Sequence, residues 1–80
     1  MTRQTLNRIK ELRKEAGLSQ QELADQLGIM RQTISNWERG INSLRPENSE
    51  RLARVFKVSV GYLLGMTTDK SDYGLLSKKN

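Results

Sequence analysis

The segment from Ser19 to Gly40 contains two stretches of helical length that are separated by a very short turn, and this spacing constrains the fold most strongly. The first stretch opens with Ser19 and Glu22 at the spacing of a capping box, in which each side chain satisfies a free backbone N–H at the other position. Gly28 is a residue typical of a helix end, and only Ile29 and Met30 precede the second stretch. The segment therefore predicts a helix-turn-helix arrangement.

The second stretch, Met30 to Gly40, has two chemically different sides when it is placed on a helix. Its apolar stripe, with Glu38 at the edge, consists of Met30, Ile34, Trp37 and Ile41. The opposite side presents Gln32, Asn36 and Arg39, flanked by Arg31, Thr33 and Ser35. Amide and guanidinium groups match the edges of bases in the major groove, whereas Trp37 belongs to the apolar stripe and is predicted to lie in the core. The stretch is therefore predicted to be a recognition helix.

A preceding helix is predicted from about Gln4 to Ala16, where apolar residues recur in steps of three and four before Gly17. One charged residue, Arg13, lies within this apolar stripe and requires a partner or a route to water. Glu38 is in the corresponding position on the other stripe. The two side chains are therefore expected to meet as a partly buried ion pair between the first and third helices.

Two further helices are predicted after Gly40. The fourth begins at Pro46, which suits a first helical turn because its missing N–H is not needed there. Its buried stripe is expected to contain Asn48 or Ser49, Leu52, Val55 and Phe56, and its outer side Arg51, Arg54 and Lys57. Ser59 is expected to cap a short fifth helix from Val60 to Leu64, in which Tyr62, Leu63 and Leu64 are core residues, dimer contacts or both. No strand pattern is visible, so the predicted fold is all-α, a compact five-helix domain.

The domain is expected to span residues 1–65, with residues 66–80 forming a polar, flexible C-terminal tail. The tail's only large apolar residues after Met66 are Tyr73, Leu75 and Leu76, which are candidates to contact the domain, a second subunit or another protein.

Composition narrows the classes of function. The chain has no Cys and no His, and its nine acidic residues are scattered along the sequence. No metal site, no cofactor and no enzymatic activity are therefore expected. It has no run of membrane-spanning length and no signal-peptide pattern, which predicts a soluble, cytoplasmic protein without a membrane partner. Its net charge of +5 fits a polyanionic partner, because neutralised phosphates release condensed counterions.

Three sequence runs carry a resemblance to a known family: L-S-Q-Q-E-L-A-D-Q-L-G at 18–28, I-S-N-W-E-R-G at 34–40 and L-A-R-V-F-K-V-S-V-G-Y-L-L-G at 52–65, with Pro46 before the last. In this order and spacing, from about residue 6 to 65, the chain resembles the phage-repressor/Cro type of helix-turn-helix domain, the Xre-like family. The resemblance implies five helices, binding to double-stranded DNA and a two-fold homodimer on a pseudo-palindromic operator.

The resemblance also implies roles for individual residues. The candidates for base contact are Arg31, Gln32 and Asn36. The candidates for contact with phosphate or flanking atoms are Ser19, Gln20, Thr33, Ser35, Arg39, Asn42, Ser43 and Arg45. The family also tends to pair an arginine of the first helix with the glutamate after the aromatic residue of the third, which here are Arg13 and Glu38. Met30 departs from the pattern, because relatives often have a capping Ser or Thr there.

Two functions fit these features. The first is a sequence-specific transcriptional regulator, acting as a homodimeric repressor on its operator. The second is a protein-interaction module of the same fold, such as an antitoxin or an antirepressor, whose protein partner binds through the C-terminal tail. The basic net charge favours DNA as the partner.

Overall fold

The computed structural model describes residues 7–41 and 44–70, and within these ranges all regular structure is helical. The elements are α1 (Ile9–Glu15), α2 (Gln20–Leu27), α3 (Arg31–Glu38), α4 (Pro46–Phe56) and α5 (Val60–Leu63). The predicted all-α, five-helix architecture is therefore confirmed. None of these helices, in the part of the chain that is described, has the length and apolar character needed to cross a bilayer.

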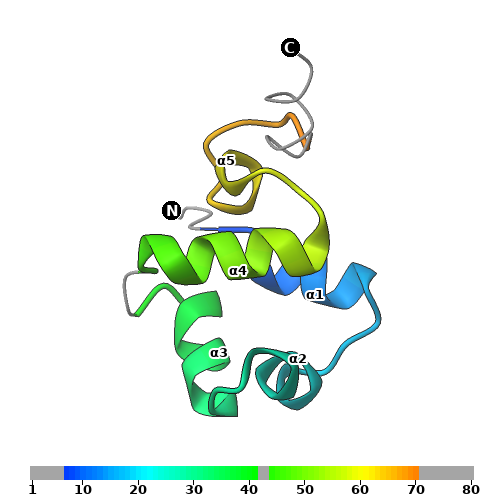
Figure 1. Ribbon diagram of the computed structural model, residues 1–80, viewed down its shortest axis with the longest axis vertical. Coiled ribbons are helices and arrows are strands. Elements are labelled where there is room, and N and C mark those ends of the chain that lie inside the picture. The colour runs from blue at the N-terminus through cyan, green and yellow to red at the C-terminus, as the bar shows by residue number, and fades with distance from the viewer. Residues whose placement is uncertain (1–6, 42–43, 71–80) are drawn as a thin grey trace.

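The helices surround one hydrophobic core, to which every one of them contributes. The pair α2 and α3 lies on one side of α4, and α5 lies on the other side (Figure 1). The core's fully buried large side chains are Ile9, Leu23, Ile34, Leu52 and Leu63. Trp37 is 5% exposed and belongs to this core, as predicted. The core therefore fixes α3 by its inner side and leaves its outer side accessible.

Both ends of α2 are built as the sequence predicts. The Ser19 hydroxyl accepts a hydrogen bond from the Glu22 backbone N–H at 3.0 Å, and the Glu22 carboxylate accepts one from the Ser19 N–H at 2.8 Å. At the other end, Gly28 adopts φ +71°, a left-handed conformation that a residue with a Cβ adopts at a cost. This reversal brings Ile29 and Met30 directly to the start of α3.

The predicted start of the first helix at Gln4 is wrong, because Asn7 and Arg8 are not helical and α1 begins at Ile9. The Asn7 side chain accepts a hydrogen bond from the Ile9 N–H at 3.1 Å and donates one to the Trp37 carbonyl at 2.9 Å. The Arg8 N–H donates to the Leu63 carbonyl at 2.8 Å. The two long-range contacts, to Trp37 and Leu63, hold Asn7 and Arg8 outside the helix that the periodic pattern predicted.

The apolar stripe predicted for the third helix is shorter than the sequence indicated. Met30 is 72% exposed and Ile41 is 56% exposed, whereas Ile34 is fully buried. Met30 has extended backbone before the helix, and Gly40, with φ +73°, turns the chain away after it. Both residues therefore lie beyond the helical segment to which the 3.6-residue period applies.

Arg51 was expected to face water, but it is half-buried and its guanidinium donates a hydrogen bond to the Leu27 carbonyl. That carbonyl belongs to the last turn of α2, where backbone acceptors lack helical partners. Arg51 thereby joins α4 to the end of α2. Arg54 and Lys57 are exposed, as expected.

The structure places Tyr62 and Leu63 in the core, with 7% and 0% exposure, and leaves Leu64 half-buried. The Arg8 guanidinium lies 4.1 Å from the centre of the Tyr62 ring and donates to the Tyr62 carbonyl at 2.5 Å. Arg8 also donates to the Thr67 carbonyl at 3.0 Å. The segment after α5 thus runs close to the start of the domain.

Candidate nucleic-acid interface

The outer side of α3, together with Arg39 directly after the helix, forms what we call the recognition face, and none of its members carries a negative charge. It consists of Arg31, Gln32, Thr33, Ser35, Asn36 and Arg39. The two arginines and Gln32 are exposed, and the other three are half-buried. Because Ile34 and Trp37 anchor the opposite side in the core, the helix presents these groups in a fixed direction.

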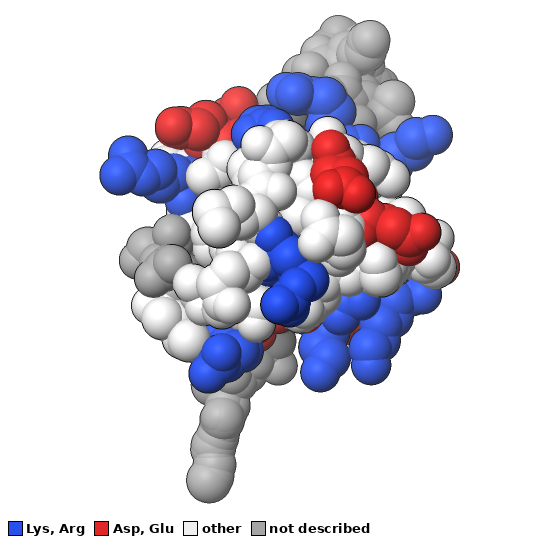
Figure 2. Space-filling view, turned by 90° about the horizontal axis from the view of Figure 1, so that it is seen from below, with Lys and Arg blue, Asp and Glu red and all other residues white. Residues whose placement is uncertain are grey.

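Viewed from the side of α2 and α3, the surface shows uncharged side chains with Lys and Arg among and around them (Figure 2). Asp and Glu lie mainly in the upper half of this view. Glu38, the acidic residue of α3, does not contribute a free charge here, because its side chain is 4% exposed and paired. The surface therefore combines hydrogen-bonding groups with positive charge, as an interface with a polyanion requires.

Two amides of the recognition face are joined. Gln32 Nε2 donates a hydrogen bond to Asn36 Oδ1 at 3.1 Å across one helical turn. This bond uses one of the two donors of Gln32 and leaves its carbonyl oxygen and both Asn36 N–H donors for other partners. The pair can therefore present donors and acceptors side by side, the pattern that the edge of adenine matches.

Arg13 and Glu38 form the ion pair that the sequence analysis expected. Arg13 Nε lies 2.6 Å from Glu38 Oε2, and a second guanidinium nitrogen lies 3.2 Å from Oε1. The third nitrogen donates to the Leu18 carbonyl at 2.9 Å. With side chains that are 10% and 4% exposed, the pair ties α1 to α3 in a largely dry setting.

Gln20 extends this pair to the recognition face. Its Nε2 donates to Glu38 Oε1 at 3.0 Å, and its Oε1 accepts from the Arg31 guanidinium at 3.3 Å. The buried carboxylate and the exposed arginine are thus connected through one amide at the start of α2. This bridging role was missed in the sequence, because the partners are 18 and 11 residues away and no local pattern marks them.

Comparison with known proteins agrees with this geometry. A family model described as helix-turn-helix matches residues 9–63, which include all five helices. This chain belongs to the helix-turn-helix family. It is 36% identical over 73 residues to the HTH-type transcriptional regulator ImmR of Bacillus subtilis, covering 89% of this chain and 58% of that protein.

A second relative is the cryptic phage CTXphi transcriptional repressor RstR of Vibrio cholerae, with 32% identity over 72 residues, 90% of this chain and 65% of the repressor. An HTH-type transcriptional regulator of Methanothermobacter thermautotrophicus is 48% identical over 46 residues, 58% of this chain and 67% of that protein. The expected resemblance to the phage-repressor type is confirmed. The chain spans about three fifths of the length of the first two relatives.

In this helix-turn-helix domain, Ser19 and Gln20 lie at the start of α2, next to the recognition helix. The Ser19 oxygen accepts from the Glu22 N–H, so its hydroxyl proton remains available to a phosphate oxygen. The nitrogen and the oxygen of the Gln20 side-chain amide each make a hydrogen bond within the protein, which makes Gln20 a support for Arg31 as well as a candidate contact.

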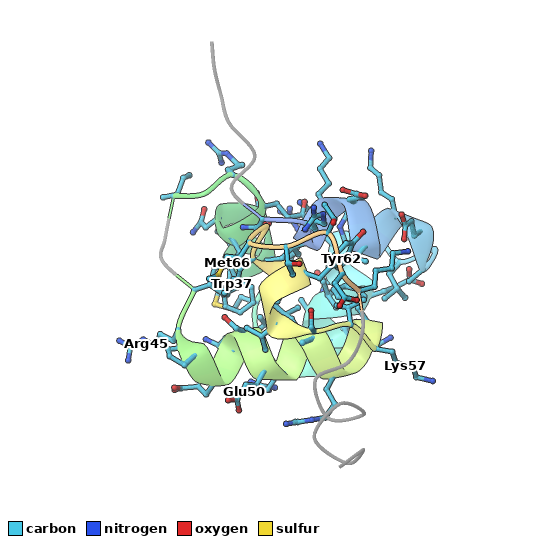
Figure 3. The ribbon with its side chains drawn as sticks, turned by 90° about the horizontal axis from the view of Figure 1, so that it is seen from above. Trp37, Arg45, Glu50, Lys57, Tyr62 and Met66 are labelled. Carbon is cyan, nitrogen blue, oxygen red and sulfur yellow. The ribbon has the colours of Figure 1, made fainter. Side chains whose placement is uncertain are left out.

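The remaining candidates follow α3 in the sequence. Arg45 is exposed at the N-terminus of α4, and its side chain points away from the body of the domain (Figure 3). Asn42 and Ser43 lie outside the described residues. Met30 provides no side-chain cap for α3, as its identity predicted. The first backbone N–H groups of α3 therefore receive no hydrogen-bond acceptor from the side chain of Met30.

Proposed function

We propose that the chain is a sequence-specific transcriptional repressor that binds a pseudo-palindromic operator in double-stranded DNA as a homodimer. The observation that carries this proposal is the recognition face, which displays five polar or basic side chains on the second helix of a helix-turn-helix and a sixth directly after it. In this arrangement the second helix enters the major groove and the first crosses the phosphate backbone.

The chemistry of the face supports reading of bases in addition to binding of phosphates. Arginine pairs with guanine through two hydrogen bonds, and asparagine or glutamine pairs with adenine in the same way. Arg31, Gln32 and Asn36 are the proposed base readers. Ser19, Gln20, Thr33, Ser35, Arg39 and Arg45, together with Asn42 and Ser43 in the adjoining loop, are proposed to contact phosphates or flanking atoms.

The proposed homodimer matches the two-fold symmetry of the proposed operator. Two copies of α3 placed about 34 Å apart enter successive major grooves on one face of the duplex. Repression then results from steric exclusion of polymerase from an overlapping promoter. The names of the two relatives, a transcriptional regulator and a phage repressor, support this role.

Selection of binding sites from random DNA duplexes, followed by footprinting, tests the proposal. We expect enrichment of a two-fold symmetric site whose half-sites are about one helical turn apart, with affinity that falls steeply as salt rises. Enrichment of a single half-site argues against the homodimer. Absence of any enriched sequence at low salt, together with co-purification of a protein that covers α3, contradicts a DNA-reading role.

Gln20→Ala is expected to weaken binding to the selected operator by about two- to tenfold, the equivalent of one ordinary hydrogen bond. The variant removes the acceptor that holds the Arg31 guanidinium at 3.3 Å, so Arg31 loses its orientation. A fluorescence-anisotropy titration measures the effect. Gln21→Ala is the matched control, because among the described residues the Gln21 amide bonds only to Asp25 on its own helix, at 2.9 Å. Equal affinities for the two variants would show that Gln20 does not act through Arg31.

A further inference from the structure

A groove lies between the first half of α4 and the outer side of α5, away from the recognition face. It has a volume of about 440 Å³ and is lined by Leu44, Pro46, Ser49, Glu50, Ser59, Val60, Gly61 and Leu64. Leu44, Val60 and Leu64 are half-buried, so their apolar atoms face partly into this open space. A groove of this size is large enough to receive several side chains.

The described chain stops at the rim of this groove. Ser59, one of its lining residues, donates a backbone hydrogen bond to the Lys70 carbonyl at 3.1 Å. Its hydroxyl donates to the Asp69 carbonyl at 3.1 Å. Lys70, the last described residue, therefore lies beside the groove.

The sequence of residues 71–80, S-D-Y-G-L-L-S-K-K-N, matches the groove in chemistry. Its apolar residues are Tyr73, Leu75 and Leu76, and a basic pair follows at Lys78 and Lys79. An extended chain advances about 3.3 Å per residue, so Tyr73 can lie up to about 10 Å from Lys70. The groove side of α5, from Ser59 to Leu64, is about 7.5 Å long at 1.5 Å per residue. The apolar residues of the segment are thus within reach of the whole apolar side.

Acidic side chains lie at the α4 side of the groove, where the basic pair can arrive. Glu50 lines the groove, and Glu47 is exposed one turn earlier on the same helix. Figure 3 shows Glu50 on the outer side of α4, between Arg45 and Lys57 at the two ends of the helix. Lys78 is eight residues beyond Lys70, a reach of up to about 26 Å.

We propose that residues 71–80 fold back into the groove of their own molecule, with the apolar side chains of Tyr73, Leu75 and Leu76 covering Val60 and Leu64. The basic pair then faces Glu47 and Glu50. This docking is a property of the domain that does not depend on DNA binding.

Engineered cysteines test the proposal directly, because the chain contains no cysteine of its own. The full chain carrying Val60→Cys and Leu75→Cys is oxidised mildly, and the disulfide is followed on a non-reducing gel and by mass spectrometry. We expect a monomer with an internal disulfide that forms at least about tenfold faster than in a control pair, since docking raises the local concentration of the two thiols.

The control pair is Lys57→Cys with Leu75→Cys. Lys57 is exposed and lies two residues before Ser59, so an undocked tail reaches it as readily as Val60. Equal rates for the two pairs overturn the proposal. A disulfide-linked dimer from the Val60 pair shows that a second copy supplies the segment, which also overturns it.

A variant without cysteines provides a second measurement. Replacement of Tyr73, Leu75 and Leu76 by serine in the full chain is expected to shift the backbone amide NMR signals of residues 59–64 and to leave those of α3 unchanged. No shift in the signals of 59–64 contradicts docking, even where a cysteine variant disturbs the fold.

Discussion

Replacement of both Gln32 and Asn36 by alanine is expected to reduce affinity for the selected operator by about 30-fold or more. Each well-formed pair of hydrogen bonds to a base discriminates by about 1–3 kcal/mol, so the loss of two such contacts removes at least about 2 kcal/mol. Binding to random DNA should change little, since contacts to phosphate carry no sequence information. Competition of the selected operator against random duplex in a gel-shift experiment measures both quantities.

The single variants are expected to be non-additive. Gln32 Nε2 donates to Asn36 Oδ1 at 3.1 Å, so each amide orients the other, and removal of either one releases its neighbour. The sum of the two single losses should therefore exceed the loss in the double variant. Gln26→Ala serves as the control, because it removes an exposed amide of α2 that is not part of the recognition face. An unchanged operator preference in the double variant rules out α3 as the reader.

Glu38→Ala is expected to lower the free energy of unfolding by about 3–5 kcal/mol, because it leaves a buried charge without a partner. The Glu38 carboxylate accepts two hydrogen bonds from Arg13, at 2.6 and 3.2 Å, and one from Gln20 at 3.0 Å. Arg13 is 8% exposed and cannot recover its hydration without a rearrangement of α1. The loss is large for a small domain, whose total stability is about 5–15 kcal/mol. Urea denaturation followed by circular dichroism measures it.

Two variants separate the loss of the pair from a general effect of mutation. The double variant Arg13→Met with Glu38→Met should lose less stability than Glu38→Ala, since no unpaired charge remains in the interior. Glu15→Ala removes an exposed carboxylate of α1 and should change stability by no more than about 0.5 kcal/mol. A cost for Glu38→Ala as small as that of Glu15→Ala would mean that the ion pair does not hold α1 and α3 together.

Several features of the fold were predictable because their causes are local. The capping box of Ser19 and Glu22 and the left-handed turn at Gly28 depend on residues within one helical turn, and the structure contains both. The burial of Ile34 and Trp37 followed from a 3.6-residue period, which needs no knowledge of the neighbouring helices. Arg13 was also informative, since a charge inside an apolar stripe requires a partner from elsewhere.

The failures occurred where a distant contact competes with a local pattern. Asn7 and Arg8 lie within the range predicted for the first helix, yet they are not helical and hydrogen-bond to Trp37 and Leu63. Met30 and Ile41 match the stripe of α3 in spacing but lie beyond its ends, where the period no longer applies. Periodicity predicts which side of a helix is buried, but it gives no information about residues beyond the ends of the helix.

For the site, the sequence by itself determined the chemistry of the recognition face. The order of residues along a helix already fixes which of them share a side. Only the tertiary structure decided that Gln20 joins Glu38 to Arg31 and that Arg51 bonds to the end of α2. These partners are 11 to 24 residues apart in the chain, and they meet because the packed core fixes how the helices cross. The order of residues thus determines which side chains a helix presents on each side, and the packing of the helices determines which side chains from different helices come into contact.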